Sequence, residues 1–164
     1  MSNRLNLRQF QQQLNDRMQG KGQAGEQVST LGIQLGGDLW LVEMSDISEV
    51  LPIPPITAVP FTKHWYRGMA NVRGNLYSVV DLAVFMGQAD VLHDGRSRIL
   101  LAAQKFSFNA GLLVSRVLGL RNIRTWRRSE VGGRIQYEDQ QGQIWQQLDI
   151  AKLLRQPDFL HVEI

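Results

Sequence analysis

Residues able to carry catalysis or bind a metal are few and scattered in this sequence. The three histidines, His64, His93 and His161, lie far apart and lack the spacing typical of a metal site. No cysteine is present, which excludes disulfides, thiol nucleophiles and thiolate ligands. The sequence contains neither a G-x-S-x-G nucleophile elbow nor a phosphate-binding G-x-x-x-x-G-K-[ST] loop. We therefore predict no catalytic residue, no metal site and no cofactor, and a protein that is not an enzyme.

The carboxylates do not change this prediction. Asp81, Glu138 and Asp139 are available for acid–base work, but nothing in the sequence pairs them for it. Asp81 stands between an apolar strand pattern and a short helical turn. Its simplest role is that of an N-cap, which accepts hydrogen bonds from the first backbone amides of the helix.

Two further charged residues stand in apolar surroundings. Glu49 lies between the apolar Ile47 and Val50-Leu51, and Arg73 follows the apolar Val72. Charges buried among apolar side chains need a partner, so we expect Glu49 and Arg73 to pair with each other. A structural ion pair is the preferred interpretation, and direct contact with a partner protein is the alternative.

Basic residues gather in one stretch of a chain whose net charge is only +3. The cluster consists of Arg116, Arg121, Arg124, Arg127 and Arg128. A solvated strand face or a protein-binding surface explains it, and no nucleic-acid motif accompanies it. The alternative is a small β-barrel nucleic-acid-binding protein that uses residues 121–128, including Trp126.

Composition and hydropathy place the chain among soluble globular proteins. Its 164 residues are 43% hydrophobic, which is enough to bury a core. No apolar run approaches the roughly 20 residues that a membrane-spanning helix requires. The N-terminus is polar and lacks the apolar stretch of a signal peptide. We expect a cytoplasmic protein.

The hydrophobic periodicity divides the chain into two parts. Residues 5–18 have apolar side chains at helical spacing, and the glycines at 20, 22 and 25 then form a flexible joint. Residues 1–27 are therefore predicted to be a helical extension with a Gly-rich linker. From residue 28 to 164, apolar residues alternate instead, which predicts a mainly β domain.

The β domain is predicted to contain about ten short strands and short peripheral helices. Ser45 or Asp46 is expected to cap a helical turn leading into Ile47 and Val50. The proline-rich residues 52–60 are expected to form a loop or a sheet edge. Gly74 is predicted to occupy a tight turn with positive φ between two strands. Many short strands with frequent turns indicate small barrels or a sandwich.

Four ordered elements resemble the CheW-like domain family. Residues 68–82, GMANVRGNLYSVVDL, resemble its signature G-x-x-N-x-R-G-x-x-x-P-x-x-D-L. Upstream, residues 47–51 are similar to its I-x-E-V-L element. Downstream, residues 111–117 resemble its G-x-x-V-D-x-V strand, and residues 148–154 its closing L-D-x-x-K-L-L helix. Ser78 and Ser115 depart from the pattern, where proline and an acidic residue are usual.

The resemblance implies a fold of two five-stranded SH3-like barrels packed side by side. It also implies a scaffold role, in which the tip of a methyl-accepting chemotaxis receptor and the regulatory domain of a CheA-type histidine kinase are the partners. The implied receptor groove is lined by Ile47, Gly68, Ala70 and Val79, for which ordinary core packing is the alternative. The N-terminal helix and the Trp65-Tyr66 pair resemble the members of this family that control type IV pili and twitching motility.

Two tryptophans, Trp65 and Trp126, are candidates for both core and interface. Trp65 precedes an apolar strand pattern, and Trp126 lies within the basic stretch. Large aromatic side chains anchor both cores and protein interfaces, so either role fits each of them.

Overall fold

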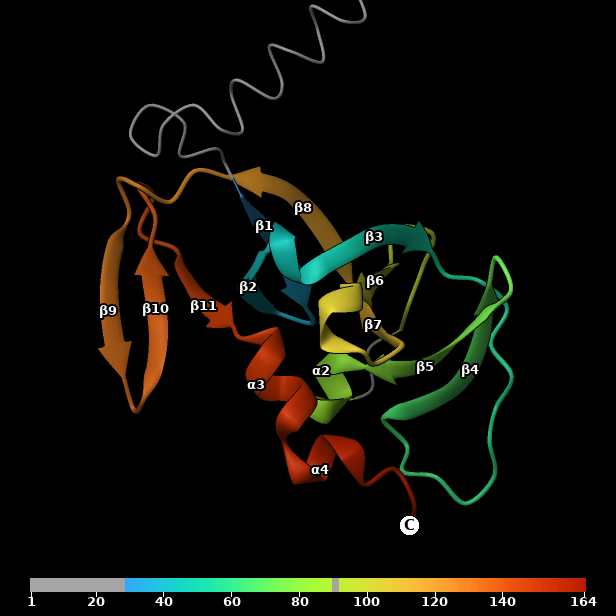
Figure 1. The fold of residues 1–164 in the computed structure, drawn as a ribbon. Helices are drawn as coiled ribbons and strands as arrows, with labels where there is room; N and C mark the ends of the chain where they lie inside the picture. The colour runs from blue at the N-terminus through green and yellow to red at the C-terminus, as the bar shows by residue number, and fades with distance from the viewer. Residues whose placement is uncertain (1–28, 90–91) are drawn as a thin grey trace, which may run out of the picture.

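The computed structural model describes residues 29–89 and 92–164. This part of the chain forms eleven strands and several short helices (Figure 1). None of its helices is long and apolar enough to cross a membrane. The predicted N-terminal helix and linker lie outside the described residues.

The first sheet has six strands and combines the start and the end of the β domain. Its antiparallel hairpin β1–β2 pairs with β8 on one side and, through a parallel contact, with β11 on the other. In spatial order the strands are β8 (Arg116–Arg121), β1 (Thr30–Leu35), β2 (Asp38–Glu43), β11 (Ile144–Leu148), β10 (Arg134–Glu138) and β9 (Arg127–Val131). Strands β8 and β9, which border the basic stretch of the sequence, are therefore the two opposite edges of this sheet.

The second sheet has five strands from the middle of the chain. Their order is β3 (Ile47–Pro52), β6 (Arg98–Ala102), β7 (Ala110–Val114), β5 (Asn75–Asp81) and β4 (Tyr66–Val72). Only the β5–β7 contact is parallel. Strands β3 and β4 are the edges of this sheet, and the proline-rich loop joins them along the chain.

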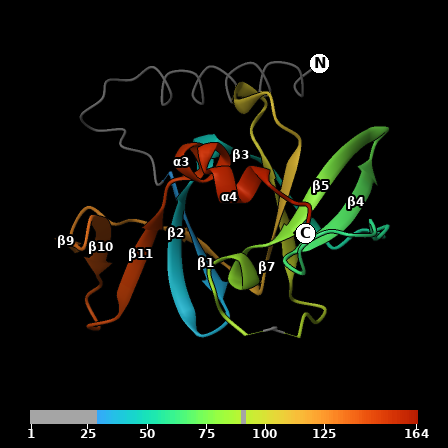
Figure 2. The same ribbon diagram turned by 90° about the horizontal axis from the view of Figure 1, so that it is seen from below.

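Short helices fill the space between the sheets. They are α2 (Leu82–Phe85), α3 (Ile150–Arg155) and α4 (Pro157–Leu160), with 3-10 turns η1 (Met44–Asp46) and η2 (Gln104–Phe106). In Figures 1 and 2, α3 and α4 lie between strands β9–β11 and the β4–β5 hairpin. The carboxylate of Asp149 caps α3 by accepting a hydrogen bond from the Lys152 amide at 3.0 Å, which explains where this helix begins.

Two apolar clusters hold the domain together. The larger one combines side chains of both sheets with α2, α3 and α4, for example Ile33, Leu112 and Ile150, which are fully buried. The smaller one lies within the second sheet and contains Ala70, Val79, Ile99, Leu101 and Leu113. The larger cluster contains side chains of both sheets, so the two sheets share this core.

The predicted fold class is confirmed, with two differences in detail. The fold is mainly β with two sheets and a few short helices, but one sheet has six strands where five were expected. The expected helical turn near Ile47 is only the 3-10 turn Met44–Asp46, which has no side-chain cap. Ile47 itself begins strand β3, since its segment pairs with β6 and gains ladder hydrogen bonds that an isolated helical turn lacks.

Candidate protein-binding surface

The four residues predicted to line a receptor groove are buried. Ile47 is 7% exposed and belongs to the larger core, whereas Ala70 and Val79, at 2% and 0%, belong to the smaller one. Gly68 is buried in β4. The side chains of Ile47, Ala70 and Val79 pack within the domain, as the core-packing alternative expects.

Gly68 allows the proline-rich loop to approach β4 closely. Its φ is +130°, and a Cβ atom at this position would lie 2.0 Å from the carbonyl oxygen of Thr57. The next residue, Met69, exchanges two backbone hydrogen bonds of 2.8 and 2.9 Å with Thr57. A side chain at position 68 would therefore push the loop away from its only bridge to this strand among the described residues.

Glu49 and Arg73 form an ion pair that joins the two edges of the second sheet. The Arg73 Nη1 atom lies 2.6 Å from Glu49 Oε2, and its second nitrogen contacts the other carboxylate oxygen, so the contact is bidentate. Glu49 belongs to edge strand β3, and Arg73 follows edge strand β4. The sheet therefore curls until its edges meet, which is the geometry of a small barrel around the smaller core.

The expectation that this pair is buried is wrong. The side chain of Arg73 is 70% exposed and that of Glu49 is 30% exposed. Glu49 stands on an edge strand and Arg73 in the turn after β4, so the charged ends of both side chains reach solvent. The hydrogen bond from Arg73 holds the pKa of Glu49 below its ordinary value.

The turn that carries Arg73 has an unusual backbone. Arg73 and Gly74 have φ values of 52° and 85°, as two-residue hairpin turns of type I′ require. The Gly74 amide donates a hydrogen bond of 2.8 Å to the side-chain oxygen of Asn71. Positive φ is natural for glycine and costly for arginine, so the turn holds Arg73 in a strained conformation facing Glu49.

Apolar side chains lie next to this ion pair. Leu51 on β3 and Val72 on β4 are half-buried and pack against the smaller core. We call Glu49, Leu51, Val72 and Arg73 the barrel rim. The rim combines partly exposed apolar surface with a charged pair, as a surface for an amphipathic partner requires.

A second polar cluster centres on Asp81, which is fully buried. Its carboxylate accepts a hydrogen bond from the Val84 amide as the N-cap of α2, at 3.4 Å. It also contacts Arg67 Nη2 at 3.0 Å and His93 Nε2 at 2.7 Å. The other ring nitrogen of His93 lies 3.3 Å from the Ser97 hydroxyl, so His93 links the loop before β6 to the end of β5.

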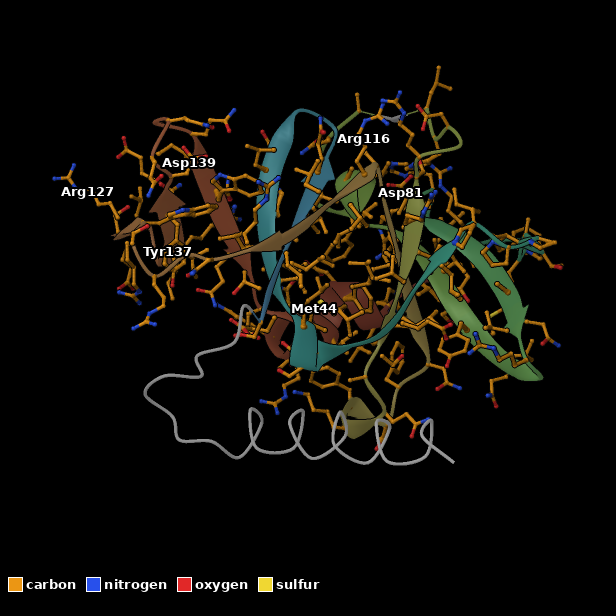
Figure 3. All side chains as sticks on the ribbon, turned by 90° about the horizontal axis from the view of Figure 1, so that it is seen from above. Met44, Asp81, Arg116, Arg127, Tyr137 and Asp139 are labelled. Atoms are coloured by element: carbon orange, nitrogen blue, oxygen red, sulfur yellow. The ribbon has the colours of Figure 1, made fainter. Side chains whose placement is uncertain are left out.

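The environment of Asp81 favours its charged form. Burial by itself raises the pKa of this carboxyl group, but hydrogen bonds from His93 and Arg67 outweigh burial, and the net pKa lies below the ordinary value. Figure 3 shows Asp81 well inside the molecule, unlike Arg127 at its margin. The sequence indicated only the N-cap role, because Arg67 and His93 stand 14 and 12 residues from Asp81 and no motif links them.

The basic residues lie on two edge strands and on the segment 122–126 that joins them. Arg116 and Arg121 lie on β8, and Arg127 and Arg128 lie on β9 at the opposite edge of the six-stranded sheet. Arg116 contacts Asp94 at 3.3 Å, and the Arg121 guanidinium lies 5.3 Å from the centre of the Trp145 ring. Figure 3 shows Arg116 and Arg127 far apart on the molecule.

The tryptophans take different roles. Trp65 is 8% exposed and stacks on Phe159 with ring centres 6.1 Å apart, so it belongs to the core. Trp126 is half-buried, and its ring centre lies 5.4 Å from that of Trp145. Among residues 29–89 and 92–164, no three His, Cys, Asp or Glu side chains gather as a metal site would require.

Comparison with known proteins identifies the class that this fold and these motifs define. The family model of the CheW-like domain matches residues 29–158, which include both sheets. The chain therefore belongs to the CheW-like domain family, and the resemblance seen in the sequence motifs is confirmed.

The chain is similar to several individual members of this family. The chain is 33% identical to Protein PilI of Pseudomonas aeruginosa over 101 residues, which are 62% of this chain and 56% of PilI. It is 33% identical over 88 residues to Protein FrzA of Myxococcus xanthus (53% of this chain, 54% of FrzA). It is 26% identical over 98 residues to the chemotaxis protein CheW of Thermotoga maritima (60% and 64%). The matches thus span roughly half to two thirds of each relative.

A solved structure supports the fold. The scaffolding protein TtCheW from Thermoanaerobacter tengcongensis superimposes with a TM-score of 0.67 over 79% of this chain and 93% of TtCheW. At 19% identity, this likeness speaks for the shared fold and for nothing finer.

Proposed function

We propose that this protein is a non-catalytic chemosensory adaptor, which couples the tip of a methyl-accepting receptor to the regulatory domain of a CheA-type histidine kinase. The match of the CheW-like domain to residues 29–158 is the observation that carries this proposal. Such an adaptor needs no reaction of its own. It transmits a signal when receptor state changes the free energy with which the kinase is bound.

The proposed pathway is the control of type IV pili and twitching motility. The similarity to Protein PilI supports this assignment over flagellar control, and the similarity to FrzA supports a chemosensory system more generally. In this pathway the protein acts in the cytoplasm and is recruited to receptor arrays at the membrane.

The barrel rim is the proposed receptor contact. The groove predicted from the sequence at Ile47, Gly68, Ala70 and Val79 is buried, so its proposed part is to shape the surface above it. A helical receptor tip would place apolar side chains against Leu51 and Val72. The exposed, strained Arg73 would orient the tip through its guanidinium group.

A binding assay tests the proposed function. The full-length chain is immobilised and presented with the regulatory domain of each CheA-type kinase of the source genome at about 150 mM salt. We expect one kinase domain to be retained, and a receptor-tip fragment to be retained as well. If no kinase regulatory domain binds, the adaptor proposal fails.

Variants of the rim test the receptor contact separately. We expect Arg73→Asn to weaken receptor-tip binding about tenfold, as loss of a charge-assisted contact does, without affecting kinase binding. Lys105→Gln, which breaks the 2.7 Å ion pair with Asp46 and changes no rim residue, is the matched control and should bind normally.

The nucleic-acid alternative is tested with the same preparation. Of its basic residues, Arg116 lies far from Arg127 (Figure 3), whereas Arg121 and Arg127 flank the segment 122–126 that joins two edge strands. A labelled oligonucleotide whose affinity falls steeply between 50 and 200 mM salt, on the scale of about 10³-fold, would revive this alternative.

A further inference from the structure

A cavity between the first sheet and α3 has features of a ligand site that the adaptor role does not use. Its volume is about 220 Å³, larger than the roughly 150 Å³ engineered cavity that admits benzene. The walls come from β2, β10, β11 and α3 and from Met86, which directly follows α2. The cavity is formed by this chain alone, and its volume suits a small molecule.

The inner wall of this cavity is apolar. Trp40, Leu148 and Leu153 are 5%, 4% and 2% exposed, and Met86 is half-buried beside them. The indole N–H of Trp40 is also buried and has no hydrogen-bond partner in the described part of the chain. Such a wall favours an apolar body, and a buried donor without a partner is costly unless an acceptor reaches it.

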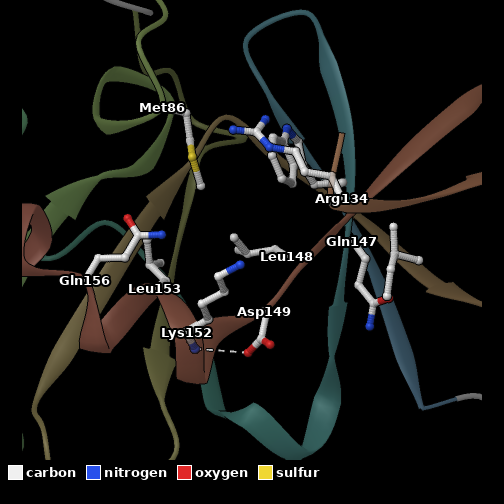
Figure 4. A pocket seen from close by; sticks show the side chains of 11 residues that line it. Met86, Arg134, Gln147, Leu148, Asp149, Lys152, Leu153 and Gln156 are labelled. Atoms are coloured by element: carbon white, nitrogen blue, oxygen red, sulfur yellow. Dashed lines mark hydrogen bonds between the residues drawn. The ribbon is translucent and has the colours of Figure 1, made fainter. Parts of the chain in front are cut away.

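Two cations converge on the mouth of the cavity. Figure 4 shows the Lys152 ammonium extending over Leu148 from α3, while the Arg134 guanidinium points towards Met86 from β10. Neither side chain has a hydrogen bond or ion pair among the described residues. Two like charges directed into one concave site repel each other, and an anion between them would remove this cost.

The remaining charge in the lining limits which anion fits. Among the described residues, Asp149 is the only carboxylate that lines the cavity, and it caps α3 by accepting a hydrogen bond from the Lys152 amide. With one carboxylate against two cations, the site has a net charge of +1. A monoanion therefore suits it better than a dianionic phosphate, and arginine binds carboxylates in a bidentate way.

We propose that this cavity binds an organic carboxylate with a short apolar chain. The chain packs against Trp40, Leu148 and Leu153, and the carboxylate lies between Arg134 and Lys152. Because Arg134 belongs to the β9–β10 hairpin and Lys152 to α3, the bound ligand connects these two elements.

The test uses the full-length chain and hexanoate, followed by NMR at the indole N–H signals. The chain has four tryptophans, so the signal of Trp40 is assigned with Trp40→Phe. We expect hexanoate to shift the Trp40 signal with a Kd of about 1–10 mM, as an eight-atom ligand of ordinary efficiency would. Hexanol and inorganic phosphate should each bind at least about tenfold more weakly.

Matched variants show whether the two cations hold the carboxylate. Arg134→Gln and Lys152→Gln should each weaken hexanoate binding about tenfold, and both change exposed side chains, so folding is preserved. Arg155→Gln on the same helix, outside the cavity lining, should leave binding unchanged. Hexanoate binding that is absent, or that these variants leave unchanged, overturns the proposal.

A partner's acidic side chain is the other source of the same chemistry. If hexanoate does not bind, while Arg134→Gln and Lys152→Gln weaken capture of the kinase domain, the cavity is a protein contact and the small-molecule proposal fails. Hexanoate binding is measured on the isolated chain, so it is decided independently of the adaptor function.

Discussion

At the scale of single residues, Arg73 combines an ion pair with a backbone conformation that does not suit it. Its φ of 52° is disfavoured for arginine and well tolerated by asparagine. An exposed ion pair contributes little to stability, because both charges are well solvated in the unfolded chain. The pair with Glu49 should therefore add little to the free energy of unfolding, and Arg73 can serve the proposed receptor contact without a cost in stability.

We predict that Arg73→Asn unfolds at a urea concentration no lower than the parent chain. The relief of backbone strain offsets the loss of the contact with Glu49. Arg73→Ala is the control, because it removes the ion pair but keeps a side chain that disfavours positive φ, and its midpoint should be lower. If the urea midpoint of Arg73→Asn were lower than that of Arg73→Ala, the ion pair would outweigh the backbone strain.

Asp81 is the residue at which charge contributes to stability. We predict that Asp81→Asn lowers the free energy of unfolding by about 2–4 kcal/mol at pH 7, since it leaves Arg67 and His93 without their carboxylate. Chemical denaturation of both proteins measures this difference. Asp149→Asn, at an exposed N-cap, keeps a capping side chain and should cost less than about 1 kcal/mol.

The lowered pKa of Asp81 makes the stability of the protein depend on pH. The folded pKa of Asp81 lies below its unfolded value of about 3.9, so its stabilisation is present above that pH. It is lost as the pH falls through the lower, folded pKa. The gap in unfolding free energy between parent and Asp81→Asn should therefore shrink from pH 7 to pH 3, and a constant gap would assign the effect to packing.

At the scale of elements, Gly68 determines how the proline-rich loop meets β4. Gly68→Ala places a methyl group 2.0 Å from the Thr57 carbonyl oxygen, at a φ of +130°. We predict a loss of roughly 3 kcal/mol or more, because the loop must move and the backbone is strained as well. Thermal or urea unfolding measures this loss.

Gly37→Ala is the matched control for that prediction. Gly37 lies in the β1–β2 turn, where a Cβ would meet nothing within 4 Å and φ is not positive. Its substitution should change stability by no more than about 0.5–1 kcal/mol, in the stabilising direction if at all. Equal losses at both positions would contradict the role assigned to Gly68.

Individual elements show what the sequence could and could not predict. The N-cap at Asp81 and the turn at Gly74 rest on local chemistry, which a single segment reveals. Strand β3 was missed, because Ser45 and Asp46 suggest a helical turn and only pairing with β6 reveals the strand. The exposure of Arg73 and the contact of His93 with Asp81 depend on which segments meet in space, and no local pattern encodes them.

At the scale of the whole molecule, one apolar cluster joins both sheets and the C-terminal helices. Phe159 of α4 is 2% exposed and contacts the rings of Trp65, Phe85 and Phe108, with centres 5.3–6.4 Å away. A shared core makes the parts interdependent, because opening one sheet exposes the apolar side chains of the other. The described domain should therefore unfold as one unit.

We predict a single unfolding transition, seen at the same urea concentration by far-UV circular dichroism and by tryptophan fluorescence. Phe159→Ala should shift both probes together, with a loss of about 3–5 kcal/mol, whereas Phe61→Ala, at an 82% exposed position, should cost about 0.5 kcal/mol or less. If Phe159→Ala instead separated the two probes into distinct transitions, each sheet would be stable alone. The barrel rim on one sheet and the cavity beside the other would then lack the rigid connection that a shared core provides.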